Sequence, residues 1–391
     1  MQYRKDKYGH DLSILGYGCM RFSRKGAGID IDKTEQEILE AFRAGVNYYD
    51  TAYIYPGSEA ALGEILARNG IRDQVNIATK LPQYMVKSRA SLDKFFDEEL
   101  SRLRTDRVDY YLMHHLTDIA QWERLKGVGV LDWIREKKSA GAIRNIGFSY
   151  HGNTANFLKI LQDYDWDFCQ IQYNYLDDTS QAGVEGLRAA AARGIPVVIM
   201  EPLRGGRLAN IPADLADRLK AREPQRSIAS WAFRYVGSFP RVMCALSGMT
   251  YMEHLQDNLE NFLDFEPLTD EEKQLLWDIA DRMENYPLVP CTGCQYCMPC
   301  PYGINIPGIF KFYNDNVTAG TYVESKEQEG YAKARRKYLL AYNEAIPTVR
   351  QADHCIACRR CEKDCPQNIR IPDQLRRIDR YIESLKRETL E

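Results

Sequence analysis

Short apolar segments alternate with amphipathic segments eight times between Leu12 and about Phe262. This alternation is the pattern of repeated βα units, which build parallel sheets. Eight units in roughly 250 residues match a TIM barrel in number and size, whereas an open doubly wound sheet normally has fewer strands. We therefore predict an α/β fold, a (β/α)8 TIM barrel, with strands at Ile14–Met20, Val46–Thr51, Val75–Lys80, Val108–His114, Ile143–Ser149, Phe168–Tyr173, Val197–Met200 and Val242–Ser247.

Amphipathic helices are expected between these strands. Four of them end at a glycine, namely Gly45, Gly70, Gly141 and Gly194, and the next strand follows within a few residues. Glycine at this position permits the left-handed conformation that closes many helices. The predicted helices include Lys33–Ala44, Ala60–Arg68, Leu92–Arg104, Leu131–Ser139, Asn156–Asp163, Val184–Arg193 and Ser227–Tyr235.

The composition changes after one further helix, which is expected over Thr269–Glu284 because Thr269 can cap it and acidic residues occupy its first turn. Residues Tyr286–Ile306 contain four prolines, two glycines and four cysteines, which is typical of a cofactor-binding loop. We place the barrel with its extra helix at residues 1–284 and a smaller, mainly α-helical domain at residues 285–391. Its helices are expected near Gly308–Asn316, Lys326–Ala341 and Pro372–Arg387.

Eight of the eleven cysteines form two groups in this second domain. The later group has two, two and three residues between its cysteines and ends in Cys-Pro, which is the bacterial ferredoxin spacing for a [4Fe-4S] cluster. The earlier group keeps the closing proline, but its last cysteine comes one residue early. The two groups predict a ferredoxin-like domain with two [4Fe-4S] clusters, ligated by Cys291, Cys294, Cys297 and Cys300 and by Cys355, Cys358, Cys361 and Cys365.

In such pairs of groups, the cysteine before the proline usually ligates the neighbouring cluster. Cys300 would then serve the second cluster and Cys365 the first. Structural zinc and disulfides are the alternatives, but neither explains four closely spaced cysteines that occur twice. Charges at His354, Arg359 and Arg360 would tune a cluster potential, or would simply belong to a solvated turn.

The remaining sequence features concern compartment and partners. No apolar run is long enough to span a bilayer, and Met1–His10 is unlike a secretory signal, so we expect a cytoplasmic protein with reduced thiols. The net charge of -3 suggests neither nucleic acid nor a membrane surface as a partner. The three cysteines outside the groups are expected in the core: Cys19, Cys169 and Cys244.

Polar residues follow three consecutive predicted strands at their carboxyl ends, where TIM barrels carry their active sites. Asp50 ends the second strand and Tyr55 lies in the loop after it, Lys80 ends the third strand, and His114 ends the fourth. A tyrosine alone would be explained better by packing. The four together predict a proton-donating catalytic cluster.

These residues lie in segments that resemble motifs of the aldo-keto reductases: DTAYIY, ATK and YYLMHH, followed by IGFSYH, CQIQYN and EPLRGG. The resemblance covers Leu12 to about Phe262 and extends to the branch whose barrel precedes a ferredoxin-like domain. It implies that Tyr55 donates a proton to a carbonyl oxygen while hydride reaches the carbon. Lys80 would lower the pKa of Tyr55, Asp50 would orient Lys80, and His114 would position the carbonyl. His115 would be a bystander.

The resemblance also implies a nicotinamide cofactor. Ser149 and Gln170 would bind its carboxamide, the loop from Pro202 to Arg207 would surround the pyrophosphate, and Asn258 would reach the adenine. The family commonly has an aromatic ring where this chain has Met200, and the stretch SGMTYMEHLQDN offers only His254 as a basic residue, so NADPH and NADH both remain open. The full set of expected cofactor-binding residues is Met20, Ser149, Gln170, Met200, Pro202, Leu203, Arg204, Gly206, Gly248 and Asn258.

The clusters raise a question of electron counting, because hydride transfer moves two electrons and a [4Fe-4S] centre moves one. FMN can handle both steps and could occupy the phosphate-binding end of the barrel. The leading hypothesis is an oxidoreductase that reduces a small-molecule carbonyl, or another polarised double bond, with NAD(P)H. The alternatives are an FMN and iron-sulfur enzyme that takes electrons from a ferredoxin or similar carrier, and a non-catalytic redox sensor. Two loops, Leu116–Gly129 and Leu176–Gly183, are expected to form the substrate pocket.

Overall fold

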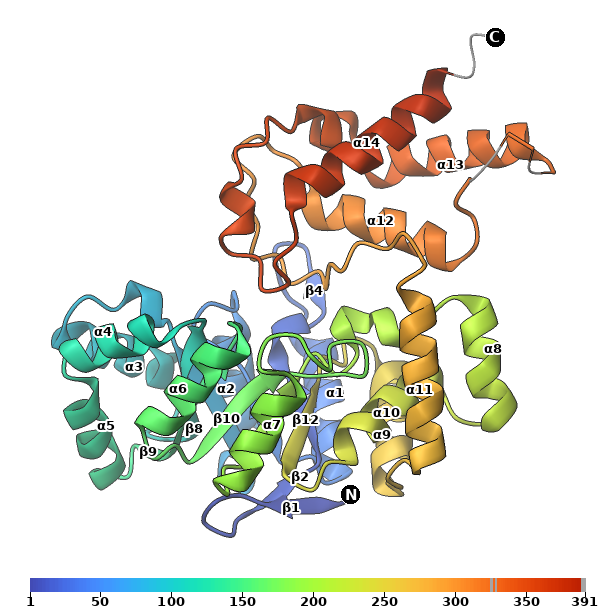
Figure 1. Ribbon diagram of the computed structural model, residues 1–391. Helices are drawn as coiled ribbons and strands as arrows, with labels where there is room; N and C mark the ends of the chain where they lie inside the picture. The colour runs from blue at the N-terminus through green and yellow to red at the C-terminus, as the bar shows by residue number, and fades with distance from the viewer. Residues whose placement is uncertain (324–325, 328, 388–391) are drawn as a thin grey trace. The chain divides into compact units, whose positions relative to one another are not determined.

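The computed structural model describes residues 1–323, 326–327 and 329–387 (Figure 1). The chain divides into two compact units: Met1–Leu203 with Ser230–Lys273, and Arg204–Ala229 with Gln274–Glu391. The division falls within two helices, α9 (Ile228–Gly237) and α11 (Asp270–Met283). The domain boundary after Glu284 stays a prediction, and residues 388–391 of the predicted second domain lie outside the described residues.

The first unit contains a closed barrel of eight parallel strands in the order β10-β11-β12-β3-β6-β7-β8-β9. This arrangement confirms the predicted TIM barrel, and each predicted strand overlaps an observed one. The strands are β3 (Leu15–Gly18), β6 (Tyr48–Asp50), β7 (Asn76–Leu81), β8 (Val108–Leu116), β9 (Ile143–Tyr150), β10 (Phe168–Gln172), β11 (Val197–Met200) and β12 (Val242–Ser247).

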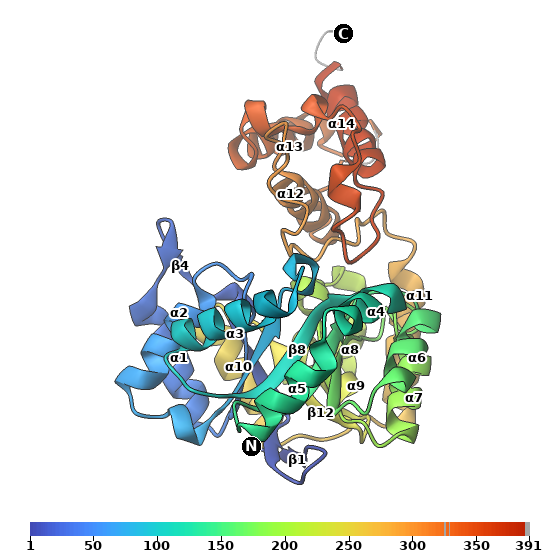
Figure 2. The same cartoon turned by 90° about the vertical axis from the view of Figure 1, so that its left-hand side faces the viewer.

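Helices connect the strands and lie on the outside of the barrel (Figures 1 and 2). Each predicted helix overlaps an observed one, and the four glycines at predicted helix ends all have positive φ. The helices of the first unit are α1 (Ile31–Arg43), α2 (Ser58–Arg68), α3 (Arg89–Leu103), α4 (Ile119–Gly127), α5 (Val130–Ser139), α6 (Thr154–Asp163), α7 (Gly183–Ala192), α9 (Ile228–Gly237) and α10 (Met252–Leu263).

Helix α4 corrects one expectation, because it occupies most of the segment Leu116–Gly129 that was expected to be a pocket loop. Asp118 caps the helix by accepting a hydrogen bond from the Ala120 N–H at 2.6 Å. Trp122 and Leu125 are fully buried on its inner face. The sequence does not predict this helix clearly, because its two buried apolar residues, Trp122 and Leu125, are separated by charged residues.

The barrel interior is filled by side chains from alternate strand positions, among them Tyr48, Tyr110, Phe168 and Cys244. The predicted core cysteines Cys19, Cys169 and Cys244 are all buried.

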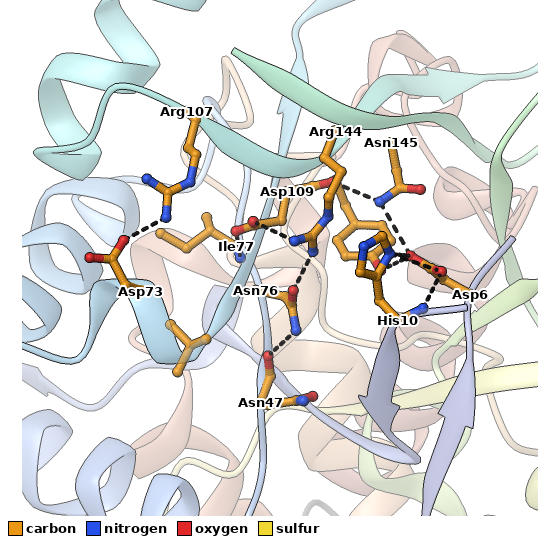
Figure 3. Close-up of polar contacts among 12 residues, drawn as sticks. Asp6, His10, Asn47, Asp73, Asn76, Ile77, Arg107, Asp109, Arg144 and Asn145 are labelled. Carbon is orange, nitrogen blue, oxygen red and sulfur yellow. Dashed lines mark hydrogen bonds and ion pairs between the residues drawn. The ribbon is translucent and has the colours of Figure 1, made fainter. Parts of the chain in front are cut away.

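The amino ends of the strands are closed by a hairpin of β1 (Tyr3–Lys5) and β2 (Asp11–Ser13). The turn of this hairpin carries Asp6, which is buried and accepts hydrogen bonds from Tyr110 Oη at 2.8 Å and from His10 N at 2.9 Å (Figure 3). Asp109 lies nearby and forms ion pairs with Arg72 at 3.1 Å and Arg144 at 3.3 Å. Buried carboxylates are tolerated here because donors surround each of them.

The second unit contains a short helix, α8 (Ala213–Arg222), part of α11, and three later helices: α12 (Ile306–Thr318), α13 (Tyr331–Ala345) and α14 (Ile371–Arg387). Ile309, Phe310, Tyr338 and Ile378 are central to its own hydrophobic core. Helix α13 begins at Tyr331, five residues later than the predicted helix at Lys326–Ala341. Gln328, within the predicted helix, lies outside the described residues. No helix in the described ranges is both long enough and apolar enough to cross a membrane.

Candidate active site and cysteine centres

The carboxyl ends of β6 and β7 bring Asp50 and Lys80 together. Lys80 Nζ lies 2.6 Å from Asp50 Oδ1 and donates a second hydrogen bond to Thr51 O at 2.5 Å. Both side chains are almost fully buried, with exposed fractions of 5% and 1%. Burial raises the pKa of Asp50, and the ion pair with Lys80 opposes that shift. The pair therefore fixes an ammonium group inside the barrel mouth.

Tyr55 and His114 complete this group. A turn after β6 holds Tyr55, whose N–H donates to Ala52 O at 3.0 Å, and its side chain is half-buried. Lys80 Nζ lies 5.3 Å from the centre of the Tyr55 ring. The His114 ring lies edge-on to the Tyr55 ring, with 6.0 Å between centres. The structure thus brings together all four residues that the sequence singled out, while their catalytic role stays a prediction.

His114 is held neutral by its surroundings. Burial lowers its pKa well below the ordinary value, and the nearby Lys80, His115 and His151 add to this effect. A neutral imidazole has one donor nitrogen and one acceptor nitrogen.

The buried polar atoms at this end of the barrel that have no hydrogen-bond partner among the described residues include Asp50 Oδ2, His114 Nδ1 and Gln170 Oε1. Buried polar atoms in native proteins are nearly always paired. At the barrel end where TIM-barrel enzymes bind their ligands, such atoms are available to hydrogen-bond a polar ligand.

The residues predicted to bind the nicotinamide end lie on adjacent strands. Ser149 on β9 is paired in register with Gln170 on β10, and Gln170 Nε2 lies 3.8 Å from the sulfur of Met200 on β11. The Ser149 hydroxyl accepts a hydrogen bond from His115 N at 2.8 Å. Sequence reasoning missed this contact between Ser149 and His115.

The other predicted cofactor residues are distributed along the chain. Asn258 on α10 donates to Ser247 Oγ at 2.9 Å, and Gly248 faces Arg21, whose Cδ lies 3.1 Å from where a Cβ on Gly248 would be. Met20 lies in a 3-10 turn at Cys19–Arg21. Four residues fall at the division between units: Pro202 and Leu203 belong to the first unit, and Arg204 and Gly206 to the second.

Within the second unit, four cysteines line one cavity together with Thr292 and Phe310: Cys291, Cys294, Cys297 and Cys365. Cys365 comes from the later sequence group, and its place beside the earlier group is the one expected of a shared ligand. Burial, together with the neighbouring thiols, raises the pKa of Cys297 to about 12. Such crowded thiols need positive charge to become thiolates, so the donor set fits a metal cluster.

The remaining predicted cluster ligands are Cys300, Cys355, Cys358 and Cys361. Burial raises the pKa of Cys361 to about 11, and Cys355 and Cys358 contribute to this shift, so these three thiols are neighbours. Cys358 is exposed, whereas the other cluster cysteines are partly buried. The assignment of Cys300 to this group stays a prediction.

Comparison with known proteins identifies two segments. Residues 14–281 match the aldo/keto reductase family, and residues 290–370 match the 4Fe-4S dicluster domain. An aldo-keto reductase of Mycolicibacterium vanbaalenii is 30% identical over 268 residues, which cover 66% of this chain and 86% of that protein. An uncharacterized oxidoreductase of Bacillus subtilis, YqkF, is 26% identical over 299 residues, which cover 66% of this chain and 90% of that protein.

A solved structure agrees in fold. The holo form of the aldo-keto reductase AKR11C1 from Bacillus halodurans matches 71% of this chain and 96% of its own, with a TM-score of 0.59 and 24% identity.

Proposed function

The chain belongs to the aldo/keto reductase family and carries a C-terminal 4Fe-4S dicluster domain, and from this we propose that it reduces the carbonyl, or another polarised double bond, of a small molecule with NADPH or NADH. The observation that supports the proposal most strongly is the grouping of Asp50, Tyr55, Lys80 and His114 at the carboxyl ends of consecutive strands. Active sites of TIM-barrel enzymes lie at this end.

In this proposal, Tyr55 is the general acid. A bound nicotinamide would supply hydride to the carbonyl carbon. Tyr55 gives its phenolic proton to the carbonyl oxygen, which is difficult at neutral pH because a free tyrosine has a pKa near 10. The ammonium of Lys80, 5.3 Å from the ring centre, stabilises the tyrosinate that forms. General acid catalysis of this kind contributes roughly 10²–10⁴-fold.

Asp50 and His114 support the proton transfer. Asp50 holds the Lys80 ammonium in place through its 2.6 Å ion pair. Neutral His114 donates a hydrogen bond to the carbonyl oxygen and thereby places it near the Tyr55 hydroxyl. Burial keeps His114 neutral, so it acts by hydrogen bonding and not as a competing acid.

The cofactor would lie along β9, β10 and β11. The unpartnered Oε1 of Gln170 is suited to the amide N–H of a nicotinamide, and Ser149 stands beside it in register. Met200 offers a thioether where the family commonly offers a ring, which gives a softer contact surface.

The dicluster domain would hold two [4Fe-4S] clusters. We assign Cys291, Cys294, Cys297 and Cys365 to the first cluster, since they share one cavity. The second would use Cys300, Cys355, Cys358 and Cys361. Exposed Cys358 makes the second cluster the natural entry point for single electrons from a ferredoxin or similar carrier. Such clusters require reduced thiols during assembly, so we place the enzyme in the cytoplasm.

The dicluster domain also favours a second candidate, an enzyme with FMN in the barrel. A flavin would connect one-electron clusters to two-electron chemistry, which a nicotinamide cannot do. Met200, which offers no ring for nicotinamide stacking, agrees with this alternative.

Absorbance of the protein purified without oxygen distinguishes the two candidates. We expect a broad iron-sulfur absorption band without the resolved bands of a flavin, and aldehyde-dependent oxidation of NADPH or NADH. A stoichiometric flavin, with no oxidation of either nicotinamide, would support the FMN enzyme.

A further inference from the structure

Two more histidines lie beside His114 at the carboxyl end of the barrel. His115 follows His114 in β8, and His151 follows the end of β9. The centres of the His115 and His151 rings are 4.8 Å apart, and those of His114 and His115 are 6.5 Å apart. His151 N donates to Leu116 O at 2.9 Å, which joins the two strand ends. The mechanism proposed above uses neither His115 nor His151.

A β-bulge brings His115 into this cluster. In a regular strand, consecutive side chains point to opposite faces, so the rings of His114 and His115 would diverge. Instead, the register between β8 and β9 shifts between Met113 and Leu116, and His115 has a φ of 57°. The left-handed conformation is strained for histidine, and both such strain and β-bulges concentrate at functional sites. The bulge is secured by the hydrogen bond from His115 N to Ser149 Oγ.

A buried chain of amides fixes the tautomer of His151. The carboxylate of Asp177 accepts hydrogen bonds from Asn174 Nδ2 at 2.8 Å and from Gln172 Nε2 at 2.9 Å. Gln172 therefore presents its Oε1 to Gln181, whose Nε2 donates to it at 2.7 Å. Gln181 in turn presents its Oε1 to His151 Nδ1 at 3.2 Å. Because an amide oxygen only accepts, Nδ1 carries the proton and Nε2 carries the lone pair.

We propose that His115 and His151 form a polar subsite of the active site, in which His151 Nε2 accepts a hydrogen bond from a hydroxyl group next to the substrate carbonyl. The inference rests on the proposed carbonyl reduction and names its substrate class, the α-hydroxy aldehydes and ketones. His115 positions the His151 ring by packing against it. Burial lowers the pKa of His151 well below the ordinary value, and the nearby His115 adds to this shift. The acceptor nitrogen Nε2 therefore stays unprotonated at neutral pH.

The subsite predicts selectivity between paired substrates. Glyceraldehyde carries a hydroxyl next to its carbonyl, and propanal has a similar carbon chain without it. One hydrogen bond to a partly buried acceptor corresponds to a discrimination of about 10-fold. His151→Phe keeps an aromatic ring against His115 but removes both nitrogens. We expect this variant to lower the ratio of kcat/KM for glyceraldehyde to kcat/KM for propanal about 10-fold.

His10→Phe is the matched control, because it makes the same replacement at the opposite end of the barrel, and it should leave the ratio of the two kcat/KM values unchanged. Differences in aldehyde hydration cancel when variant and wild type are compared on the same substrate. If His151→Phe changes both substrates equally, the subsite is overturned while the proposed function stands.

A binding measurement separates failure of the subsite from failure of the proposed function. The chain has only six histidines, so ¹⁵N-histidine spectra of the holoprotein are tractable. We expect His151 as the Nδ1–H tautomer, and we expect glycerol, but not propan-1-ol, to shift its Nε2 resonance. If neither aldehyde is reduced with NADPH or NADH, the proposed function fails. The glycerol response then decides the subsite: a shift at Nε2 supports it, and no shift or an Nε2–H tautomer overturns it.

Discussion

At the scale of single residues, the buried pair of Lys80 and Asp50 dominates the site. Its members lie 2.6 Å apart and are shielded from water, so each depends on the other for compensation of its charge. Tyr55 is different, because it is half-buried and touches the ring of His114 and the ammonium of Lys80 without belonging to the ion pair. Substitutions at Tyr55 and Lys80 should therefore separate catalysis from stability.

We predict that Tyr55→Phe lowers kcat by roughly 10²–10⁴-fold, because the proton donor is lost, and leaves Tm close to that of the wild type. Lys80→Met should lower kcat to a similar degree and also lower Tm, because it leaves the Asp50 carboxylate buried without its partner, a loss of about 3–5 kcal/mol. Steady-state kinetics with calorimetry on both variants checks this. Equal Tm losses in the two variants would contradict the assigned roles.

Asp6 predicts a pH dependence of stability at the other end of the barrel. Although burial opposes its ionisation, hydrogen bonds from Tyr110, His10 and Tyr8 lower the pKa of Asp6 below its ordinary value. The unfolded chain thus binds a proton at a higher pH than the native protein, and this contribution to stability is lost as pH falls below about 4. Urea unfolding between pH 6 and pH 3 should show the wild type losing its advantage over Asp6→Asn. A constant difference between them would contradict the low pKa.

The sequence was sufficient to predict that the four candidate residues would lie close together, because strand-end positions follow from the βα pattern and active sites of TIM barrels lie at the carboxyl ends of the strands. It could not predict the neighbourhood of His115. Strict alternation along β8 places His115 on the opposite face from His114, and only the bulge at φ 57° overrides this. The Gln172, Gln181 and His151 contacts were equally hidden, because they join the end of β10 to residues outside the strands through side-chain geometry.

At the scale of elements, the segment that follows β11 contacts the loop that carries the earlier cysteine group, Cys291–Cys300. Both contacting residues, Gly205 and Thr292, belong to the second unit. A Cβ on Gly205 would lie 2.2 Å from the carbonyl oxygen of Thr292, which adjoins Cys291. A Cβ on the neighbouring Gly206 would have open space for 4 Å around it within the described part of the chain, although the φ of Gly206 is also positive, at 99°. A segment predicted to bind the cofactor pyrophosphate therefore packs directly against a predicted cluster loop.

This contact predicts different outcomes for two otherwise similar substitutions. Gly205→Ala should lower iron content and raise KM for the nicotinamide, because the new methyl group displaces the Thr292 backbone. Gly206→Ala is the matched control and should cost only about 1 kcal/mol of backbone strain. Iron analysis and nicotinamide titrations of both variants provide the test, and indistinguishable variants would show that the two loops are not coupled.

The elements were predictable where their pattern was regular. All eight barrel strands were expected because their apolar runs alternate with amphipathic segments, and a glycine cap precedes four of them. Helix α4 was missed because its capping residue Asp118 and its anchors Trp122 and Leu125 carry a weak pattern over a short length.

At the scale of the whole molecule, the chain joins an aldo/keto reductase barrel to a 4Fe-4S dicluster domain. One cavity is lined by Cys291, Cys294 and Cys297 of the earlier cysteine group and by Cys365 of the later group, while the cluster assignment of the eight cysteines stays a prediction. The sharing of cysteines between the two groups could be predicted from the sequence, because in ferredoxins the cysteine before the proline usually ligates the neighbouring cluster. The path of electrons could not be predicted, since it depends on tertiary structure and on the bound cofactors.

Single cysteine substitutions should therefore remove clusters across the sequence groups. Cys365→Ser is expected to disrupt the cluster that uses Cys291, and Cys300→Ser the cluster that uses Cys355. Each variant should lose about half of the roughly eight irons of two [4Fe-4S] clusters. The electron paramagnetic resonance spectrum of the reduced protein should lose a different signal in each variant. Loss of the same signal in both would contradict the crossed assignment.

In the proposed mechanism, hydride passes from a nicotinamide to a substrate carbon while Tyr55 protonates the oxygen. The most direct measurement uses nicotinamide deuterated at C4 with glyceraldehyde and anaerobically purified holoprotein, followed by mass spectrometry of the alcohol product. We predict one deuterium on the new carbinol carbon with the wild type and almost no product with Tyr55→Phe. Product without deuterium, or product that forms only with a bound flavin and an external one-electron donor, would contradict the claim.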